Sequence, residues 1–273
     1  MLQLEKIVIP KNELYDLYVC KNYSSKDIAE LYGVSSITIN RRLKEYGITI
    51  KKPNRKYLFN ESYFDMIDTK DKAYLLGLIT SDGWVAKGNK RGNTIVIGLS
   101  LHQNDREVVE YFKQQLQSPA PLKRNGNSIQ ITVCSTHMCK SLEKYGIIPN
   151  KSLIVKLEDI INRTKMDDKL IPSFLLGFFD GDGGIRCCYG SNGKTIQWSC
   201  SFTSTKDSCL FLQKYFGEGK IIKENTPGGN TYTYSLSGTN QVFRNLNKLY
   251  ESHNSFCMER KHSKFLVLKS LVK

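Results

Sequence analysis

The chain has 273 residues, and 40 Lys and Arg against 26 Asp and Glu give it a formal net charge of +14. This length allows a substantial core, and basic residues spread along the sequence indicate a folded surface for a polyanionic partner. No apolar stretch reaches the roughly 20 residues that span a bilayer, no signal-peptide core follows the N-terminus, and the eight cysteines include no C-x-x-C pair. Membrane-spanning and disulfide-stapled secreted classes are thereby excluded, and we expect a cytoplasmic protein, or one of an organellar matrix.

Residues 1–50 predict a small all-α domain of the helix-turn-helix type. Helices are expected over 11–22 and 26–32, followed by a third that ends at Leu43. Ser24-x-x-Asp27 is typical of a capping box that opens the second helix, and Gly33 supplies the turn after it. The residues expected to face outward at the start of the third helix, where they could read base edges in a major groove, are Ser36, Ile37, Asn40 and Arg41. A helical hairpin used only for packing is the alternative, and the basic net charge favours DNA binding over it.

A linker is expected over residues 51–60, because its first part, Lys51 to Lys56, is basic and contains a proline. Such a segment is usually a solvated connector. In a DNA-binding protein its cations can also follow phosphates between two bound modules.

Two nine-residue segments read almost alike: LLGLITSDG over Leu75 to Gly83 and LLGFFDGDG over Leu175 to Gly183. Both are apolar helical runs whose small residues, four apart, share one helix face, so two such helices can pack backbone to backbone. Each run then ends in Asp-Gly. Glycine is common after a last helical turn, but an Asp there meets the negative end of the helix dipole. If the helices lie side by side, Asp82 and Asp182 bring two carboxylates together, which favours a divalent cation between them.

These segments resemble the motif of the LAGLIDADG homing endonucleases, specifically the single-chain members that carry two copies. The second copy keeps both acidic residues of the motif, Asp180 and Asp182, whereas the first has Thr80 at the first acidic position. In that family the second acidic residue binds the metal, and both copies retain it. The resemblance covers roughly residues 60–273.

The same order of elements follows each motif and agrees with the fold of the resembled family. The first copy reads as a strand over 94–101, a helix over 105–117, a hairpin over 122–133 and a helix over 136–145. The second reads as a strand over 195–203, a helix over 206–216, a hairpin over 220–236 and a helix over 241–250, with a final helix within 255–273. We therefore expect an α+β protein with two pseudo-symmetric αββαββα halves, 61–165 and 166–273, that form a saddle beside the helix-turn-helix domain.

Alternation of polar and apolar residues in the strands predicts sheets with one face packed on helices and the other wet. Amides, hydroxyls and cations on such a face suit a DNA groove, although any solvated sheet shows the same alternation. The residues expected to contact DNA are Lys123, Arg124, Gln130, Thr132, Arg186, Gln197, Ser199, Ser201, Lys220, Lys223, Thr231 and Thr233. Ser100 and Ser201 are expected at equivalent strand positions, where they would line the site through water.

The resemblance implies phosphodiester hydrolysis with Mg²⁺, for which Mn²⁺ would substitute. Asp82 and Asp182 would hold the metal ions, helped by the backbone carbonyls of Ser81 and Gly181, because the last carbonyls of a helix lack partners. The resemblance also implies a lysine near each metal, and Lys151 and Lys261 are the candidates. An ordinary exposed lysine is the alternative for each.

The expected activity is double-strand cleavage of a long, asymmetric DNA target by a monomer, leaving short 3′ overhangs. Two other functions stay open: a non-catalytic transcriptional regulator that joins a degenerate copy of this fold to a helix-turn-helix, and a maturase that binds the RNA of its host intron. The intact pair Asp82 and Asp182 argues against the regulator. Because the sequence starts at Met1 and lacks the terminal His-Asn of a splicing intein, a free-standing or intron-encoded protein of a mobile element is expected.

Overall fold

The computed structural model describes residues 8–51, 57–87, 95–189, 196–226, 229–251 and 256–272. Contacts divide the chain into two compact units, one of residues 1–60 with 113–121 and one of 61–112 with 122–273. Residues 52–56 of the expected linker, and positions 94, 195, 255 and 273 at the ends of expected elements, lie outside the described residues. No helix among the described residues is long and apolar enough to cross a bilayer.

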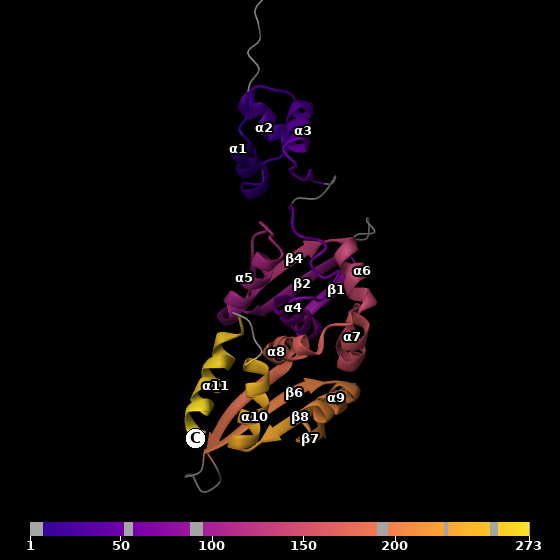
Figure 1. Cartoon of the computed structure of the whole chain (residues 1–273), viewed down its shortest axis with the longest axis vertical. Coiled ribbons are helices and arrows are strands. Elements are labelled where there is room, and N and C mark those ends of the chain that lie inside the picture. The colour runs from indigo at the N-terminus through magenta and orange to yellow at the C-terminus, as the bar shows by residue number, and fades with distance from the viewer. Residues whose placement is uncertain are drawn as a thin grey trace, which may run out of the picture. The chain divides into compact units, whose positions relative to one another are not determined.

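The first unit carries the three helices expected from the sequence, α1 (Lys11–Tyr15), α2 (Ser25–Tyr32) and α3 (Ser36–Glu45), and a π-helical turn over Asp16–Cys20 continues α1 (Figure 1). Their buried apolar side chains, among them Leu14, Ile28, Ile39 and Leu43, form one core. The first helix ends at Cys20 rather than at Asn22, because Asn22 takes a positive φ of 61°.

The capping box predicted at Ser24 is present. Its Oγ accepts a hydrogen bond from the Asp27 amide at 3.1 Å, and its own amide donates to Asp27 Oδ2 at 2.9 Å. Without these bonds, the two backbone amides at the first turn of α2 would lack a hydrogen-bond acceptor. Gly33 then ends α2 at φ 63°, in the left-handed region that a side chain disfavours. The start of α2 and the turn between α2 and α3 could therefore be predicted from neighbouring residues alone.

The second unit contains the same succession of elements twice. The first half consists of α4 (Lys70–Ser81), β1 (Gly83–Lys87), β2 (Ile95–His102), α5 (Arg106–Gln115), β3 (Lys123–Asn125), β4 (Ser128–Cys134), α6 (Thr136–Lys144) and α7 (Leu157–Thr164). The second half consists of α8 (Ile171–Asp182), β5 (Gly183–Tyr189), β6 (Ile196–Ser204), α9 (Lys206–Phe216), β7 (Lys220–Lys223), β8 (Tyr232–Ser237), α10 (Thr239–Tyr250) and α11 (Glu259–Leu271).

Each half builds a four-stranded antiparallel sheet of one topology, β1-β2-β4-β3 in the first and β5-β6-β8-β7 in the second. In Figure 1 the two sheets lie on opposite sides of the central pair α4 and α8. The alternation predicted for β4 is confirmed, since Ile129, Ile131 and Val133 are buried and the residues between them are half-buried. Helices α9 and α10 pack on the second sheet.

The register corrects one expected equivalence. Gly83 pairs with Leu99 and Gly183 pairs with Phe202. Ser201 therefore corresponds to Gly98, and Ser100 corresponds to Thr203, two positions away from the equivalence expected. Equivalent motif residues, such as Asp82 and Asp182, are 100 positions apart. Equivalent residues of β2 and β6 are separated by more than 100 positions, because the spacing of the repeat changes between the motif and this strand.

Candidate metal centre and nucleic-acid face

The two motif helices touch through their backbones. A Cβ placed on Gly77 would lie 1.9 Å from the carbonyl oxygen of Phe174, and one on Gly177 would lie 1.9 Å from that of Tyr74. No side chain fits in either gap, which confirms the close packing predicted from the small residues four apart. The ends of α4 and α8, with their Asp-Gly dipeptides, are consequently brought to the same place.

Asp82 lies against the end of the partner helix. A Cβ on Gly181 would come 1.9 Å from Ser81 Oγ and 3.0 Å from Asp82 Oδ2, so the Ser81 side chain occupies the space that this glycine leaves open and the Asp82 carboxyl lies next to it. Gly83 and Gly183 start β1 and β5. Gly183 is extended (φ −94°, ψ 163°) rather than left-handed, and a Cβ there would strike Phe179, so close packing explains this glycine.

The electrostatics of the two carboxyls fit a like-charge pair. Burial raises the pKa of Asp82, against the opposing charges of Lys261 and Lys151. Burial and then the neighbouring charge of Asp82 raise the pKa of Asp182 to about 6, although the Asp182 side chain is open to solvent on one side. A pair that resists full ionisation is the arrangement a cation stabilises.

Lys151 and Lys261 lie where the resemblance implied, but both are buried, with 4% and 2% of their surface exposed. The Lys151 ammonium donates to the carbonyls of Ser81 at 3.2 Å and Gly83 at 2.6 Å. The Lys261 ammonium lies within 2.6–3.4 Å of four carbonyls, those of Phe179, Asp180, Gly181 and Gly183. Each lysine therefore caps the C-terminal end of a motif helix, where carbonyls lack partners and the dipole is negative.

The donor set around these helix ends consists of oxygens. The carboxyls of Asp82 and Asp182 and the carbonyls of Ser81 and Gly181 are hard ligands of the kind Mg²⁺ takes while keeping several waters. Among the described residues no group of three or more His, Cys, Asp or Glu could hold a metal. The residues present thus fit a water-rich magnesium site rather than an all-protein cage, and the two carbonyls would be shared with the capping lysines.

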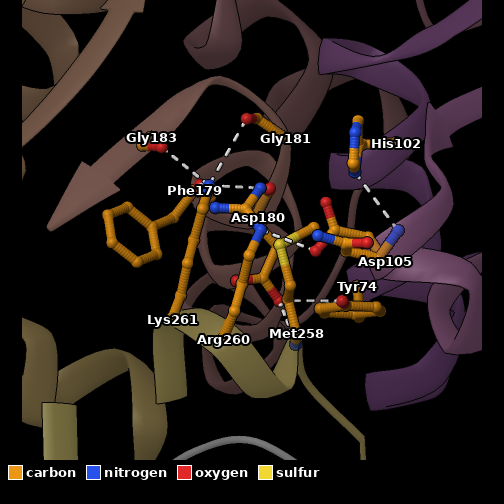
Figure 2. A network of polar contacts seen from close by, with 11 residues as sticks. Tyr74, His102, Asp105, Phe179, Asp180, Gly181, Gly183, Met258, Arg260 and Lys261 are labelled. Atoms are coloured by element: carbon orange, nitrogen blue, oxygen red, sulfur yellow. Dashed lines mark hydrogen bonds and ion pairs between the residues drawn. The ribbon is translucent and has the colours of Figure 1, made fainter. Parts of the chain in front are cut away.

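A buried polar network beside this site was not expected from the sequence. Tyr74 Oη donates to Asp180 Oδ2 at 2.8 Å, and the Met258 amide donates to the same oxygen at 2.8 Å (Figure 2). Arg260 Nε donates to Asp105 Oδ1 at 2.6 Å. In the sequence Asp180 only completes the second motif copy, and no local pattern marks Asp105, which follows a strand in an ordinary polar run.

The strand register decides which expected DNA-contacting residues share the wet faces. On the first sheet Gln130 and Thr132 share this face with Lys123, which pairs with Gln130, whereas Arg124 pairs with Ile129 and lies on the other side. Trp84 was missed: it lies on the wet face, and its indole covers Gly98 so closely that a Cβ there would be 2.1 Å away.

The second sheet shows the same division. The wet face carries Arg186, Gln197, Ser199, Ser201, Thr233 and Lys220. Lys223 pairs with Tyr232, on the side of the buried Tyr234, and so lies on the opposite face. Thr231 immediately precedes β8.

In the first unit, some of the residues that are expected to contact DNA are exposed to solvent. Ile37 is 77% exposed, and Arg41 is exposed beside Glu45 at 3.8 Å. Ser36 and Asn40 are half-buried, and Asn40 Oδ1 accepts from Ser25 Oγ at 2.6 Å, which ties α3 to α2.

Comparison with known proteins agrees with this geometry. Residues 69–130 match the model of the family described as LAGLIDADG-like domain. The chain is similar in structure to the meganuclease I-SmaMI bound to uncleavable DNA, with a TM-score of 0.54 and 14% identity over 72% of this chain and 88% of that one. The chain thus contains a LAGLIDADG-like domain and has the fold of this meganuclease.

Two further structures share the fold. The LAGLIDADG homing endonuclease I-GzeII in complex with its DNA target gives a TM-score of 0.53 and 12% identity over 75% of this chain and 90% of that chain. The LAGLIDADG meganuclease I-AabMI bound to uncleaved DNA gives 0.52 and 16% over 72% and 90%. No curated protein matches the sequence. The α+β class with two repeated four-stranded sheets, expected from the sequence, is confirmed.

Proposed function

We propose that this chain is a LAGLIDADG endonuclease, a site-specific, metal-dependent enzyme that cuts both strands of a long, asymmetric DNA target and leaves short 3′ overhangs. The observation that carries the proposal is that Asp82 lies against Gly181 at the end of α8, close enough to Asp182 for its charge to act on that carboxyl. Two carboxyls held at negative helix ends are costly without a cation.

Asp82 and Asp182 would hold Mg²⁺, or Mn²⁺ in its place, together with the carbonyls of Ser81 and Gly181. When bound, the metal supplies an activated water and neutralises charge on the phosphate and the leaving oxygen. Lys151 and Lys261 keep the helix ends fixed through their carbonyl contacts and add positive charge beside the carboxyls. A phosphodiester must then be delivered to these helix ends by the surfaces on either side.

The wet faces of the two sheets would bind the DNA and so place a phosphodiester at the helix ends. Their amides and hydroxyls can read base edges, and cations such as Lys123, Arg186 and Lys220 can hold phosphates. Because the two sheets carry different side chains on equivalent positions, the target is expected to be asymmetric, and one chain with both halves can act as a monomer.

The helix-turn-helix unit would extend this contact, with Ile37 and Arg41 as its most exposed candidates on α3. Its contribution can be measured by nuclease footprinting of the full chain. Ile37→Glu with Arg41→Gln should shorten the protected DNA at one end and leave the central protection intact. An unchanged footprint would assign this unit a packing role.

The experiment that tests the proposal starts from a randomised duplex library. The full chain captures duplexes in Ca²⁺, and the recovered duplex is then incubated in Mg²⁺, Mn²⁺ or EDTA and its ends are sequenced. We expect cleavage of both strands in Mg²⁺ and Mn²⁺ with 3′ overhangs, and none in EDTA. Specific binding without cleavage would overturn the proposal and indicate a transcriptional regulator, whereas preferential capture of intron RNA would indicate a maturase.

A further inference from the structure

The ion pair of Asp105 and Arg260 joins the two halves next to the motif ends. Asp105 precedes α5 in the first half and Arg260 lies in the first turn of α11 in the second. The Asp105 side chain is only 4% exposed, whereas Arg260 is 53% exposed. A buried carboxylate without a cation is strongly unfavourable, so Asp105 fixes Arg260 while the rest of the guanidinium stays open to solvent.

Arg260 lies next to the buried lysine that caps the end of α8. Its neighbour Lys261 bonds to the carbonyls at the end of α8 (Figure 2). Gly181 at that end lies against Ser81 and Asp82. The charge of Arg260 also acts on the Asp82 carboxyl, whose pKa burial raises.

Among the described residues the other half has a lysine rather than an arginine near the matching place, because Lys156 pairs with Asp207 at the start of α9 at 3.0 Å. Lys151 and Lys261 cap equivalent helix ends, so the residues before them, Asn150 and Arg260, correspond. At the start of α9, Thr205 donates its hydroxyl to the Val155 carbonyl instead of holding an arginine. The two halves therefore differ in kind: a guanidinium held by a buried carboxylate in one, and an ammonium paired with an exposed carboxylate in the other.

We propose that Arg260, positioned by Asp105, binds a DNA phosphate beside the motif helix ends, and that this guanidinium, matched by Asn150 in the other half, makes the two strands break at different rates. The proposal rests on the endonuclease function proposed above. Nε is held by the carboxylate, and the two Nη groups remain available for the oxygens of a phosphate, which a guanidinium binds in a bidentate manner. The buried lysines cannot reach outward in this way, because their ammonium groups are engaged by carbonyls.

The test uses the full chain and the duplex recovered in Ca²⁺, labelled differently on its two strands. Arg260→Gln should slow nicking of one strand at least tenfold relative to the other. In Ca²⁺ it should reduce the slope of log affinity against log salt by about 0.9, the value for one lost phosphate contact. Arg244→Gln is the matched control, because Arg244 is an exposed arginine on α10 that pairs with Glu218 at 3.1 Å.

Asp105→Asn tests the positioning role, and the double variant Asp105→Asn, Arg260→Gln removes the buried charge that the single Arg260→Gln would leave unpaired. The effects on strand bias should not add, since both changes act through one guanidinium. Equal slowing of both strands and an unchanged salt slope in the double variant would overturn the proposal. If the wild-type chain binds but cuts neither strand, the endonuclease function fails, while the salt slope still decides whether Arg260 contacts a phosphate.

Discussion

Tyr74 and Asp180 are joined by a 2.8 Å hydrogen bond that crosses from one motif helix to the other. Their counterparts in the repeat are Phe174 and Thr80, which form no such pair: Thr80 Oγ1 donates to the Leu76 carbonyl of its own helix at 2.7 Å. The acidic residue missing from the first motif is therefore matched by a missing hydroxyl on the facing helix. At the same position of the helix contact, one half therefore has a polar pair of side chains and the other has a largely apolar pair.

This relationship predicts the outcome of exchanging the pair. Tyr74→Phe removes a donor from a fully buried carboxyl and should lower the free energy of unfolding by about 1–3 kcal/mol. Tyr74→Phe with Asp180→Thr recreates the combination of the other half, and its loss should be smaller than the sum of the single losses. Denaturant unfolding of the three variants and wild type gives the coupling energy, and strictly additive losses would contradict the account.

Asp180 also predicts how stability varies with pH. Burial raises its pKa to about 6, against the hydrogen bonds from Met258 and Tyr74 and the charge of Lys261. The folded protein therefore holds this proton more tightly than the unfolded chain, where the carboxyl titrates near pH 4. The contribution to the free energy of unfolding is present below pH 4 and is lost as pH rises to about 6.

Asp180→Asn removes this titration. Relative to wild type, the metal-free variant should become more stable by about 2–3 kcal/mol between pH 4 and pH 7, as expected for a pKa difference of this size. Urea unfolding at several pH values measures the difference directly. Parallel curves for the two proteins would show that Asp180 does not titrate in this range.

Close helix contact predicts that Gly177→Ala is severe. The added Cβ would lie 1.9 Å from Tyr74 O, 2.8 Å from Tyr74 C and 3.0 Å from Leu78 N, all backbone atoms that cannot rotate away. The helices must separate, and we expect a loss of about 3 kcal/mol or more. The control is Ser81→Ala in the facing helix, whose hydroxyl bonds only within α4 and whose replacement should change the unfolding temperature little.

The capping role of the buried lysines predicts a stability defect as well as an activity defect. Lys261→Met leaves several carbonyls at the end of α8 without a donor, which should cost about 3 kcal/mol. Lys264→Met on the same helix is the control, because Lys264 is exposed and makes one 3.4 Å contact, to the Ile185 carbonyl. An inactive Lys261→Met protein as stable as wild type would instead make Lys261 a purely catalytic group.

Sequence patterns predicted the parts of the fold whose causes are local. The motif helices, the capping box at Ser24 and the alternation in β4 follow from neighbouring residues, and their positions agree with the structure to within a few residues. Strands β1 and β5 were not placed on residues, because each begins directly at the glycine of its motif and is short or interrupted by polar residues. Helix α7 was not expected either.

The polar contacts of the site could not be predicted, because they depend on the packing of distant segments. Arg260 and Asp105 are 155 positions apart, and Lys261 lies 78 positions from the carbonyl of Gly183. A basic chain offers many lysines, and only the folded helix ends distinguish the two that become buried. The opposite faces of Lys123 and Arg124 likewise depend on a register that composition does not encode.

The central claim is that Asp82 and Asp182 together form a metal-dependent cleavage centre. The most direct measurement compares Mg²⁺-dependent double-strand cleavage by wild type, Asp82→Asn and Asp182→Asn, with binding of the same duplex measured in parallel in EDTA. The account predicts that both variants lose double-strand cleavage by at least a thousandfold and still bind the duplex. Retained cleavage in either variant, or no cleavage by a wild-type chain that binds its duplex specifically, would contradict it.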